Sequence, residues 1–153
     1  MPSNEINIDF SQYKALLSIK KEEDKHFIFD PIRKKHLVLL PEEFVRQLVV
    51  QHLLNTMEYP KTRIGIEVGL EVNQLKRRCD VLVYNSELRP FLMVETKSAK
   101  VPINQAVFEQ IAQYNLSLKV PYLLVTNGLS TYCCKINFEE ATFEFLDELP
   151  MWE

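Results

Sequence analysis

Hydrophobic residues alternate or recur at helical spacing along most of the chain, and these patterns predict its elements. The clearest alternation covers residues 63–72, where apolar side chains occupy every second position from Ile64 to Val72. Because side chains of a strand point alternately to opposite faces, this pattern predicts a strand with one buried face. Similar segments at residues 78–84 and 90–97 are separated by a short polar turn. We expect these three segments to form an antiparallel meander.

Two longer segments have the spacing of helices. The first begins at Pro41, which suits a first helical turn, and it is expected to end near Pro60, because proline cannot continue a helix. The second is expected to run from Asn104, a favoured N-cap residue, to about Leu118. The apolar stripes predicted for the two helices are Val45, Leu48, Val49, His52 and Leu53, and Val107, Ile111, Tyr114 and Leu118.

The remaining patterns complete an α+β, or α/β-like, domain. Residues 26–29 and 36–40 are predicted to form a hairpin, and residues 120–126 and 131–138 two further strands. The order is then two strands, a helix, three strands, a helix and two strands. This order favours a mixed central sheet flanked by helices.

Length and composition restrict the class of protein. A chain of 153 residues that is 46% hydrophobic fits one domain, which we assign to residues 26–153, after a polar N-terminal leader at residues 1–25. No apolar run approaches the ~18 residues of a membrane helix, so we expect no membrane association and a cytoplasmic location. The odd number of cysteines argues against a disulfide framework. The three glycines, Gly65, Gly69 and Gly128, do not have the spacing of a Gly-x-x-x-x-Gly-Lys phosphate loop. We therefore expect no motor within this sequence.

Basic residues are concentrated in the middle of the chain, although the whole sequence has a net charge of −3. Residues 61–100 contain eight basic and five acidic residues, whereas residues 101–153 contain two basic and seven acidic residues. The basic group could neutralise nucleic-acid phosphates, although charge alone favours solvated strand ends and loops. Glu67 and Glu71 share one face of their strand, which we expect to be exposed to solvent. The basic group comprises Lys61, Arg63, Lys76, Arg77, Arg78, Arg89, Lys97 and Lys100.

Three charged side chains interrupt the apolar strands at residues 78–84 and 90–97. If the hairpin is symmetric about its turn, residues whose numbers sum to 175 face each other, which places Asp80 opposite Glu95. Lys97 lies two positions beyond Glu95 and therefore on the same face. A cation such as Mg²⁺ would compensate the two carboxylates and use water and phosphate oxygens as further ligands. The alternative is a cross-strand ion pair between one of these acids and Lys97.

These residues resemble a known catalytic motif. Asp80 followed by Glu95-Thr96-Lys97 resembles the motif of the PD-(D/E)XK nuclease superfamily, whose fold has a restriction-endonuclease-like core. From about residue 26 to 135 the chain is similar to stand-alone copies of the N-terminal domain of type I restriction enzyme R subunits. The stretches that carry this resemblance are residues 29–33, 41–47, 76–80, 94–97 and 110–115.

The resemblance implies a role for each matching residue. Asp80 and Glu95 match the metal-binding acids of the superfamily, and Lys97 matches its catalytic lysine. The implied cofactor is Mg²⁺, for which Mn²⁺ can substitute. Gln110 and Tyr114 match the Gln-x-x-x-Tyr motif of the related exonuclease-like branch, which implies a role in positioning the substrate. The alternative is that Tyr114 belongs to the helix core and Gln110 is solvated.

The first helix and the basic group supply the other candidate site residues. Superfamily members place a further glutamate on the first helix, and either Glu42 or Glu43 could fill this position; we favour Glu43. From the charge distribution, Arg77 and Arg78 are assigned to binding the substrate backbone.

The function that we expect is metal-dependent hydrolysis of DNA, alone or beside a specificity or motor subunit. The alternative is a non-catalytic DNA-binding or scaffold module with the same fold, and an RNA-cleaving enzyme would share the metal chemistry. Cleavage that depends on Mg²⁺ or Mn²⁺ separates the catalytic from the non-catalytic function. Sequence specificity, the choice between endonuclease and exonuclease, and the oligomeric state stay open.

Overall fold

The computed structural model describes residues 4–153 and confirms an α+β architecture built on a mixed sheet. The central sheet has six strands in sequence order, and all neighbours are antiparallel except the third and fourth, which are parallel. Its strands are β4 (Ile64–Val72), β5 (Leu75–Tyr84), β6 (Pro90–Thr96), β7 (Tyr122–Thr126), β8 (Thr131–Asn137) and β9 (Thr142–Phe145). The predicted meander is therefore confirmed as β4, β5 and β6.

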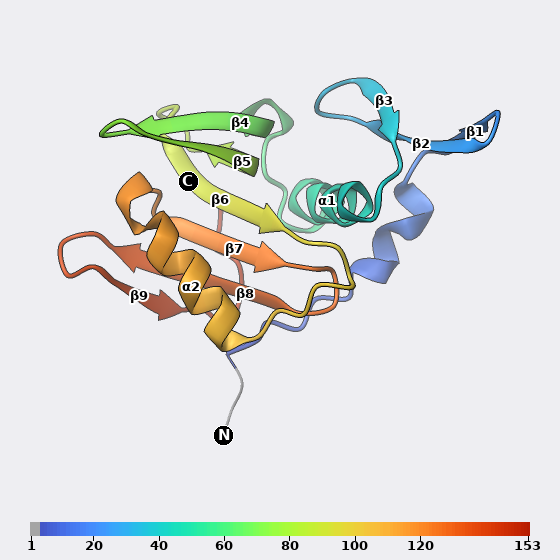
Figure 1. Cartoon of the computed structure of the whole chain (residues 1–153). Coiled ribbons are helices and arrows are strands. Elements are labelled where there is room, and N and C mark those ends of the chain that lie inside the picture. The colour runs from blue at the N-terminus through green and yellow to red at the C-terminus, as the bar shows by residue number, and fades with distance from the viewer. Residues whose placement is uncertain (1–3) are drawn as a thin grey trace.

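A smaller sheet and two main helices complete the fold. The helices are α1 (Pro41–Gln51), continued by a π-helical segment η2 (His52–Thr56), and α2 (Gln105–Asn115), continued by a 3₁₀ turn η4 (Leu116–Leu118). Short 3₁₀ segments are η1 (Phe10–Leu16) and η3 (Lys61–Arg63), and the small antiparallel sheet consists of β1 (Ile19–Glu22), β2 (Lys25–Asp30) and β3 (Lys35–Val38). Figure 1 shows this small sheet beside α1, and α2 running across β7, β8 and β9.

Two hydrophobic cores lie on opposite faces of the central sheet, because the side chains of each strand alternate. On β5, Val81 and Val83 pack in the core that contains α1, whereas Leu82 packs in the core that contains α2. The stripe predicted for the first helix, from Val45 to Leu53, is buried throughout and is thereby confirmed.

The phase of α2 differs from the prediction. The predicted N-cap is confirmed, because the Asn104 side chain accepts a hydrogen bond from the Val107 amide at 2.9 Å. The buried residues of α2 are Phe108, Ala112 and Asn115; of the predicted stripe, Leu118 is buried in the same core and Ile111 packs against it, but Tyr114 does not. Tyr114 is 60% exposed. Tyr114 lies two positions beyond the buried Ala112, so its side chain projects from a different side of the helix.

Part of the segment that was predicted as a leader packs on the domain. Ile6, Phe10 and Tyr13 are buried in the α1 core, and the Tyr13 hydroxyl lies 2.7 Å from Nδ1 of His52. Residues 1–3 of that segment lie outside the described residues.

None of the helices formed by residues 4–153 has the length and apolar character needed to cross a membrane. All three cysteines are buried free thiols, so the prediction of no disulfide framework is confirmed.

Candidate active site

The β5–β6 hairpin has the predicted register. Val81 faces Val94, and Leu82 faces Met93, so facing residues sum to 175. One further step along both strands brings Asp80 opposite Glu95. The register shift in this hairpin lies at its other end, near Val83, and leaves the acidic end undisturbed.

A small cavity of about 100 Å³ collects the main predicted residues. Asp80, Glu95 and Lys97 line it together with Glu42 from the first turn of α1. The lysine Nζ lies 3.7 Å from Oε1 of Glu95. The Lys97 amide donates to the Thr126 carbonyl at 3.0 Å, which fixes the lysine backbone to the end of β7. The acids and the lysine therefore converge on one space.

The two acids differ in how the protein satisfies them. Oδ2 of Asp80 accepts a hydrogen bond from the Thr96 amide at 2.8 Å, and Oδ1 lies 3.7 Å from Nη2 of Arg46. Oε2 of Glu95 is buried and has no hydrogen-bond partner. A buried carboxylate oxygen without a partner is energetically costly, so Glu95 has an unused capacity to bind a cation or a donor.

The donor set fits a hard cation such as Mg²⁺. Among residues 4–153 there is no group of three or more His, Cys, Asp and Glu side chains placed to hold a metal. Mg²⁺, however, commonly takes one or two carboxylates and completes its shell with water and phosphate oxygens. A cavity of about 100 Å³ has room for an ion with a few waters, each of which occupies ~30 Å³. Two carboxylates, one with an unpaired oxygen, meet this requirement.

Glu43 does not line the cavity, contrary to the favoured assignment. Its carboxylate accepts hydrogen bonds from Nη2 of Arg33 at 2.9 Å and from Nε2 of Gln47 at 3.0 Å, and Nη1 of Arg46 lies 3.3 Å away. The structure thus brings Glu42 to the cavity and buries Glu43 beside it. The pattern could not fix this because helix phase is poorly defined at an N-terminus. A catalytic role for either glutamate stays a prediction.

The buried glutamate belongs to a larger set of ion pairs, which we call the arginine–carboxylate network. The network joins β2, α1, β4 and β5, and it reaches the cavity through the contact of Arg46 with Asp80. Burial alone would lower the pKa of Arg33, but its hydrogen bonds and charge pairs with Asp30 and Glu43 raise it. The members of the network are Asp30, Arg33, Glu43, Arg46, Glu67 and Arg78.

Glu67 enters this network through an irregularity of β4. The register of β4 with β5 is the same on both sides of Glu67, because Ile66 faces Val81 and Val68 faces Cys79, but Glu67 itself has a left-handed φ of 54°. Its carboxylate lies 3.2 Å from Nη1 of Arg46 and 2.9 Å from Nη2 of Arg78.

Glu67 and Glu71 both line a hollow on the β4–β5 hairpin, in agreement with a shared face, but arginine side chains partly cover Glu67. Partial burial would raise the pKa of Glu67, but the hydrogen bond and charge of Arg46, with the charges of Arg78 and Arg33, lower it. The sequence pattern missed this contact because alternation does not reveal a single residue with a positive φ or its arginine partners.

The predicted substrate-positioning residues lie beside the cavity. Arg77 lines both the cavity and a neighbouring hollow of about 410 Å³, which Gln110 and Tyr114 also line. The guanidinium carbon of Arg77 lies 4.1 Å from the centre of the Tyr114 ring. Arg78 also lines the cavity, but its Nη2 is paired with Glu67. Arg77 is therefore the arginine of this pair whose side chain links the cavity to α2.

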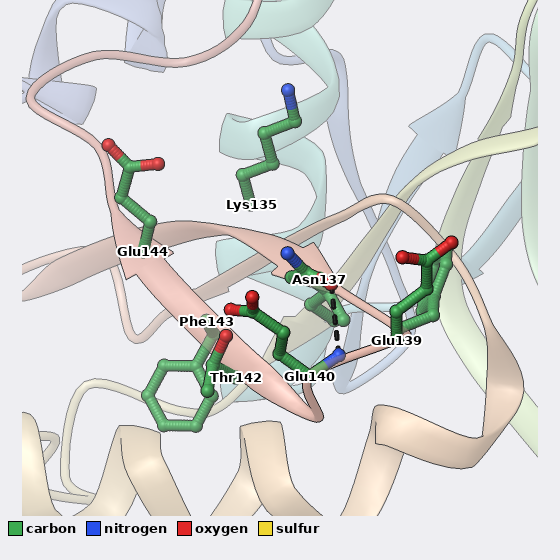
Figure 2. Close-up of a pocket in the computed structure, with 9 residues that line it drawn as sticks. Lys135, Asn137, Glu139, Glu140, Thr142, Phe143 and Glu144 are labelled. Carbon is green, nitrogen blue, oxygen red and sulfur yellow. Dashed lines mark hydrogen bonds between the residues drawn. The ribbon is translucent and has the colours of Figure 1, made fainter.

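A separate hollow of about 600 Å³ at the β8–β9 hairpin has a different character. Figure 2 shows Glu139, Glu140 and Glu144 around it, and Lys135 is the one basic side chain among its lining residues. The Glu140 amide donates to Oδ1 of Asn137 at 3.1 Å and so closes the turn. An acidic lining repels a polyanion, and this hollow shares no residue with the cavity.

Fold and site together define an α+β domain whose central hairpin carries two carboxylates and a lysine on one face. The sequence matches the family model of the type I restriction enzyme R protein N terminus over residues 41–150, so the chain belongs to this family. No curated protein matches the sequence. The matched range includes the cavity and α2, and it begins after the small sheet. The family is thus confirmed over α1 to the C-terminal tail, whereas the stretch at residues 29–33 lies outside the match.

Proposed function

We propose that this chain is a metal-dependent nuclease domain of the PD-(D/E)XK superfamily that hydrolyses phosphodiester bonds in DNA. The observation that carries the proposal is the convergence of Asp80, Glu95 and Lys97 on one cavity, with a buried glutamate oxygen that the protein leaves unpaired. Membership of a restriction enzyme family supports a nuclease-like module.

Asp80 and Glu95 are the residues that would hold the cation, Mg²⁺ or Mn²⁺ in its place. When bound, such an ion polarises the scissile phosphate and lowers the pKa of a coordinated water. The Thr96 amide holds the Asp80 carboxylate toward β6, which keeps the two acids on one side of the hairpin. This backbone contact preorganises the acids, because it does not depend on a flexible side chain.

Lys97 serves as the cationic group of the site. Its side chain is 38% exposed, so the ammonium can reach a substrate phosphate as well as Glu95. A lysine in this position orients the attacking water or stabilises the negative charge that develops on the phosphate. It contributes no ligand to a cation, because an ammonium group has no acceptor.

The basic side chains near the cavity suit the DNA backbone. Lys76, Arg77 and Arg78 line a hollow of about 690 Å³ on the β4–β5 hairpin, next to the cavity. Their charges neutralise phosphates and supply sequence-independent affinity. Sequence specificity and movement along DNA would come from partner subunits of a restriction enzyme. We place the protein in the cytoplasm.

One observation favours the non-catalytic alternative. Both oxygens of Asp80 already face a donor or a cation within the protein, the Thr96 amide and the Arg46 guanidinium. A scaffold that uses Asp80 as a structural acid needs no metal. An RNA-cleaving enzyme, by contrast, would use the same residues on a different substrate.

Cleavage of a substrate panel tests the proposal. Supercoiled plasmid, single-stranded DNA and RNA are incubated with the purified protein and Mg²⁺, Mn²⁺ or a chelator, and Mn²⁺ binding is measured by calorimetry. We expect metal-dependent cleavage of DNA by the wild type, and loss of both cleavage and metal binding in Asp80→Asn and Glu95→Gln. The matched control is Glu87→Gln, an exposed acid in the turn between β5 and β6.

Two outcomes contradict the proposal. Equal metal affinity in the wild type and in both cavity variants contradicts the assignment of Asp80 and Glu95 as metal ligands. Absence of cleavage with every metal and substrate supports the scaffold function instead.

A further inference from the structure

We propose that the hollow between β5, β6 and α2 binds an unpaired nucleobase next to the phosphate that is cut. The preferred substrate is then a single strand or a frayed end, not an intact duplex. This inference rests on the proposed nuclease function and names its substrate class. The hollow measures about 410 Å³ and is lined by Arg77, Glu95, Gln110, Ile111, Tyr114 and Asn115.

Unpaired polar atoms distinguish this hollow. Asn115 is 2% exposed, its Nδ2 donates to the Ile111 carbonyl at 2.8 Å, and its Oδ1 is buried without a partner. Nη1 of Arg77 is also buried and has no hydrogen-bond partner. Besides Oε2 of Glu95, which is assigned to the cation, the lining therefore offers one acceptor and one donor that the protein itself does not satisfy. Buried polar groups are rarely left in this state, so these two atoms indicate a polar ligand.

The same hollow has an aromatic wall. Tyr114 is 60% exposed although it lies on a helix that packs on the sheet. Arg77 lies against its ring at 4.1 Å, which holds the aromatic plane in place and adds a positive charge beside it. An exposed aromatic ring next to a cation is the usual platform on which single-stranded nucleic acids stack their bases. A planar heterocycle with polar edges therefore fits both the wall and the unpaired atoms.

The position of the hollow determines which base it receives. Arg77, Glu95 and Asn115 line both the hollow and the catalytic cavity, so the two spaces adjoin. The cavity, at about 100 Å³, carries the residues proposed to act on the phosphate, whereas the hollow, at about 410 Å³, lies within the range of ordinary ligand sites. A nucleotide strand thus places its phosphate in the cavity and an adjacent base in the hollow.

This arrangement selects against duplex DNA. In a duplex each base is stacked and paired, and removing it from the stack costs a few kcal/mol. A strand whose bases are already unpaired avoids this cost. The preference for single strands follows from the same contacts that hold the base.

Binding without cleavage tests the inference apart from catalysis. Full-length protein in Ca²⁺ is titrated with a labelled single-stranded oligonucleotide, a blunt hairpin duplex of the same sequence, and free dAMP. We expect the single strand to bind at least about tenfold more tightly than the duplex and dAMP to bind weakly. Tyr114→Ala should weaken single-strand binding by about tenfold or more, the effect of removing one base–aromatic stack, while Tyr114→Phe stays close to the wild type. The matched control is Gln113→Ala, an exposed neighbour that does not line the hollow.

A fluorescent base provides a second measurement that a purely structural role of Tyr114 would not change. The fluorescence of 2-aminopurine in the single strand should change on binding to the wild type and to Tyr114→Phe, but not on binding to Tyr114→Ala. Equal affinity for single strand and duplex, with no effect of Tyr114→Ala, overturns the inference and leaves metal-dependent cleavage untouched. Binding of dAMP as tight as that of the oligonucleotide also overturns it, in favour of a mononucleotide site. Selective single-strand binding without any metal-dependent cleavage supports base binding in the hollow and contradicts the nuclease function.

Discussion

Two polar clusters lie side by side at one end of the central sheet, and they differ in how completely the protein satisfies them. In the arginine–carboxylate network each carboxylate contacts at least one guanidinium, although Nε of Arg46 lacks a partner. In the cavity and hollow, by contrast, Glu95, Arg77 and Asn115 each keep a buried atom without a partner. Both clusters use the same residue types in similar surroundings. Residue type alone therefore does not identify a binding site, whereas several unsatisfied atoms that line one open space indicate one.

The difference assigns different roles to the two clusters. A network whose charges are matched internally gains little from a ligand. Removing one member leaves its charged partners buried without a counter-charge. A cluster with unmatched acceptors and donors gains from any ligand that completes it. The network should then determine stability, and the cavity should determine binding and catalysis.

The largest expected effect is the loss of stability in Arg46→Met. Arg46 has a side-chain exposure of 7% and pairs with Glu43, Glu67 and Asp80, so its removal leaves three carboxylates short of a partner. We expect the free energy of unfolding to fall by about 3 kcal/mol or more. Urea denaturation followed by circular dichroism measures this change. The control is Arg78→Met, whose side chain is 72% exposed and should cost less than about 1 kcal/mol.

An equal loss of unfolding free energy in the two arginine variants would contradict the idea that the buried part of the network stabilises the fold more than the exposed part. The same experiment on Glu95→Gln sharpens the comparison. Because this carboxylate keeps an unpaired buried oxygen, neutralising it should leave stability unchanged or raise it in the absence of metal.

The next effect concerns Lys97→Ala and belongs to the cavity. We expect DNA cleavage to fall by about 100-fold or more, which corresponds to ~2.7 kcal/mol of activation free energy. The melting temperature should barely change, because the ammonium is partly exposed and lies 3.7 Å from Glu95. Mn²⁺ affinity should stay the same or rise, since a repelling charge is gone. Plasmid nicking, thermal denaturation and calorimetry measure the three quantities.

Lys100→Ala, which changes an exposed lysine close by in the sequence, serves as the control for charge. If Lys97→Ala melts at a much lower temperature and nicks as fast as the wild type, the lysine is a structural ion-pair partner. The catalytic assignment is then wrong.

The smallest expected effect is a change in the pH dependence of stability on the network side. The pKa of Glu67 lies below its ordinary value of 4.5, because the attraction of three arginines outweighs partial burial. Its contribution to stability is therefore complete above pH 4.5 and is lost as the pH falls through the lowered pKa. Glu67→Gln should flatten the decrease in stability below pH 4.5 by less than about 1 kcal/mol, given its partial exposure. Glu71→Gln, at an exposed site, should not change the decrease, and an equal effect of both variants contradicts this assignment.

The sequence predicts the centre of the site better than its surroundings. Alternation and turn length determine the register of a tight hairpin, and this is why Asp80 and Glu95 could be paired in advance. The exposure of Tyr114 was not predicted, because Phe108 and Ala112 form the centre of the buried face of α2 and helical spacing alone allowed both phases. The arginine contacts of Glu67 were missed because alternation does not reveal a single residue with a positive φ.

Strands also differ in how well a pattern predicts them. β1 consists of exposed residues, so it has no alternation between buried and exposed positions and was not predicted. Asn115 was unnoticed for a related reason. Its side chain becomes informative only when the structure shows that one amide atom is satisfied and the other is not.

The parallel pairing of β6 with β7 has a consequence for the order in which the site forms during folding. The two acids lie on adjacent strands of a hairpin, so they meet after a short loop closes. The hollow requires α2, which belongs to the long crossover that any parallel pair needs, and closing that longer loop costs more chain entropy. Local contacts form faster than distant ones, so a folding or newly synthesised chain assembles its acidic centre before its nucleobase wall. Selectivity for the substrate is thus the last property of the site that the folding chain acquires.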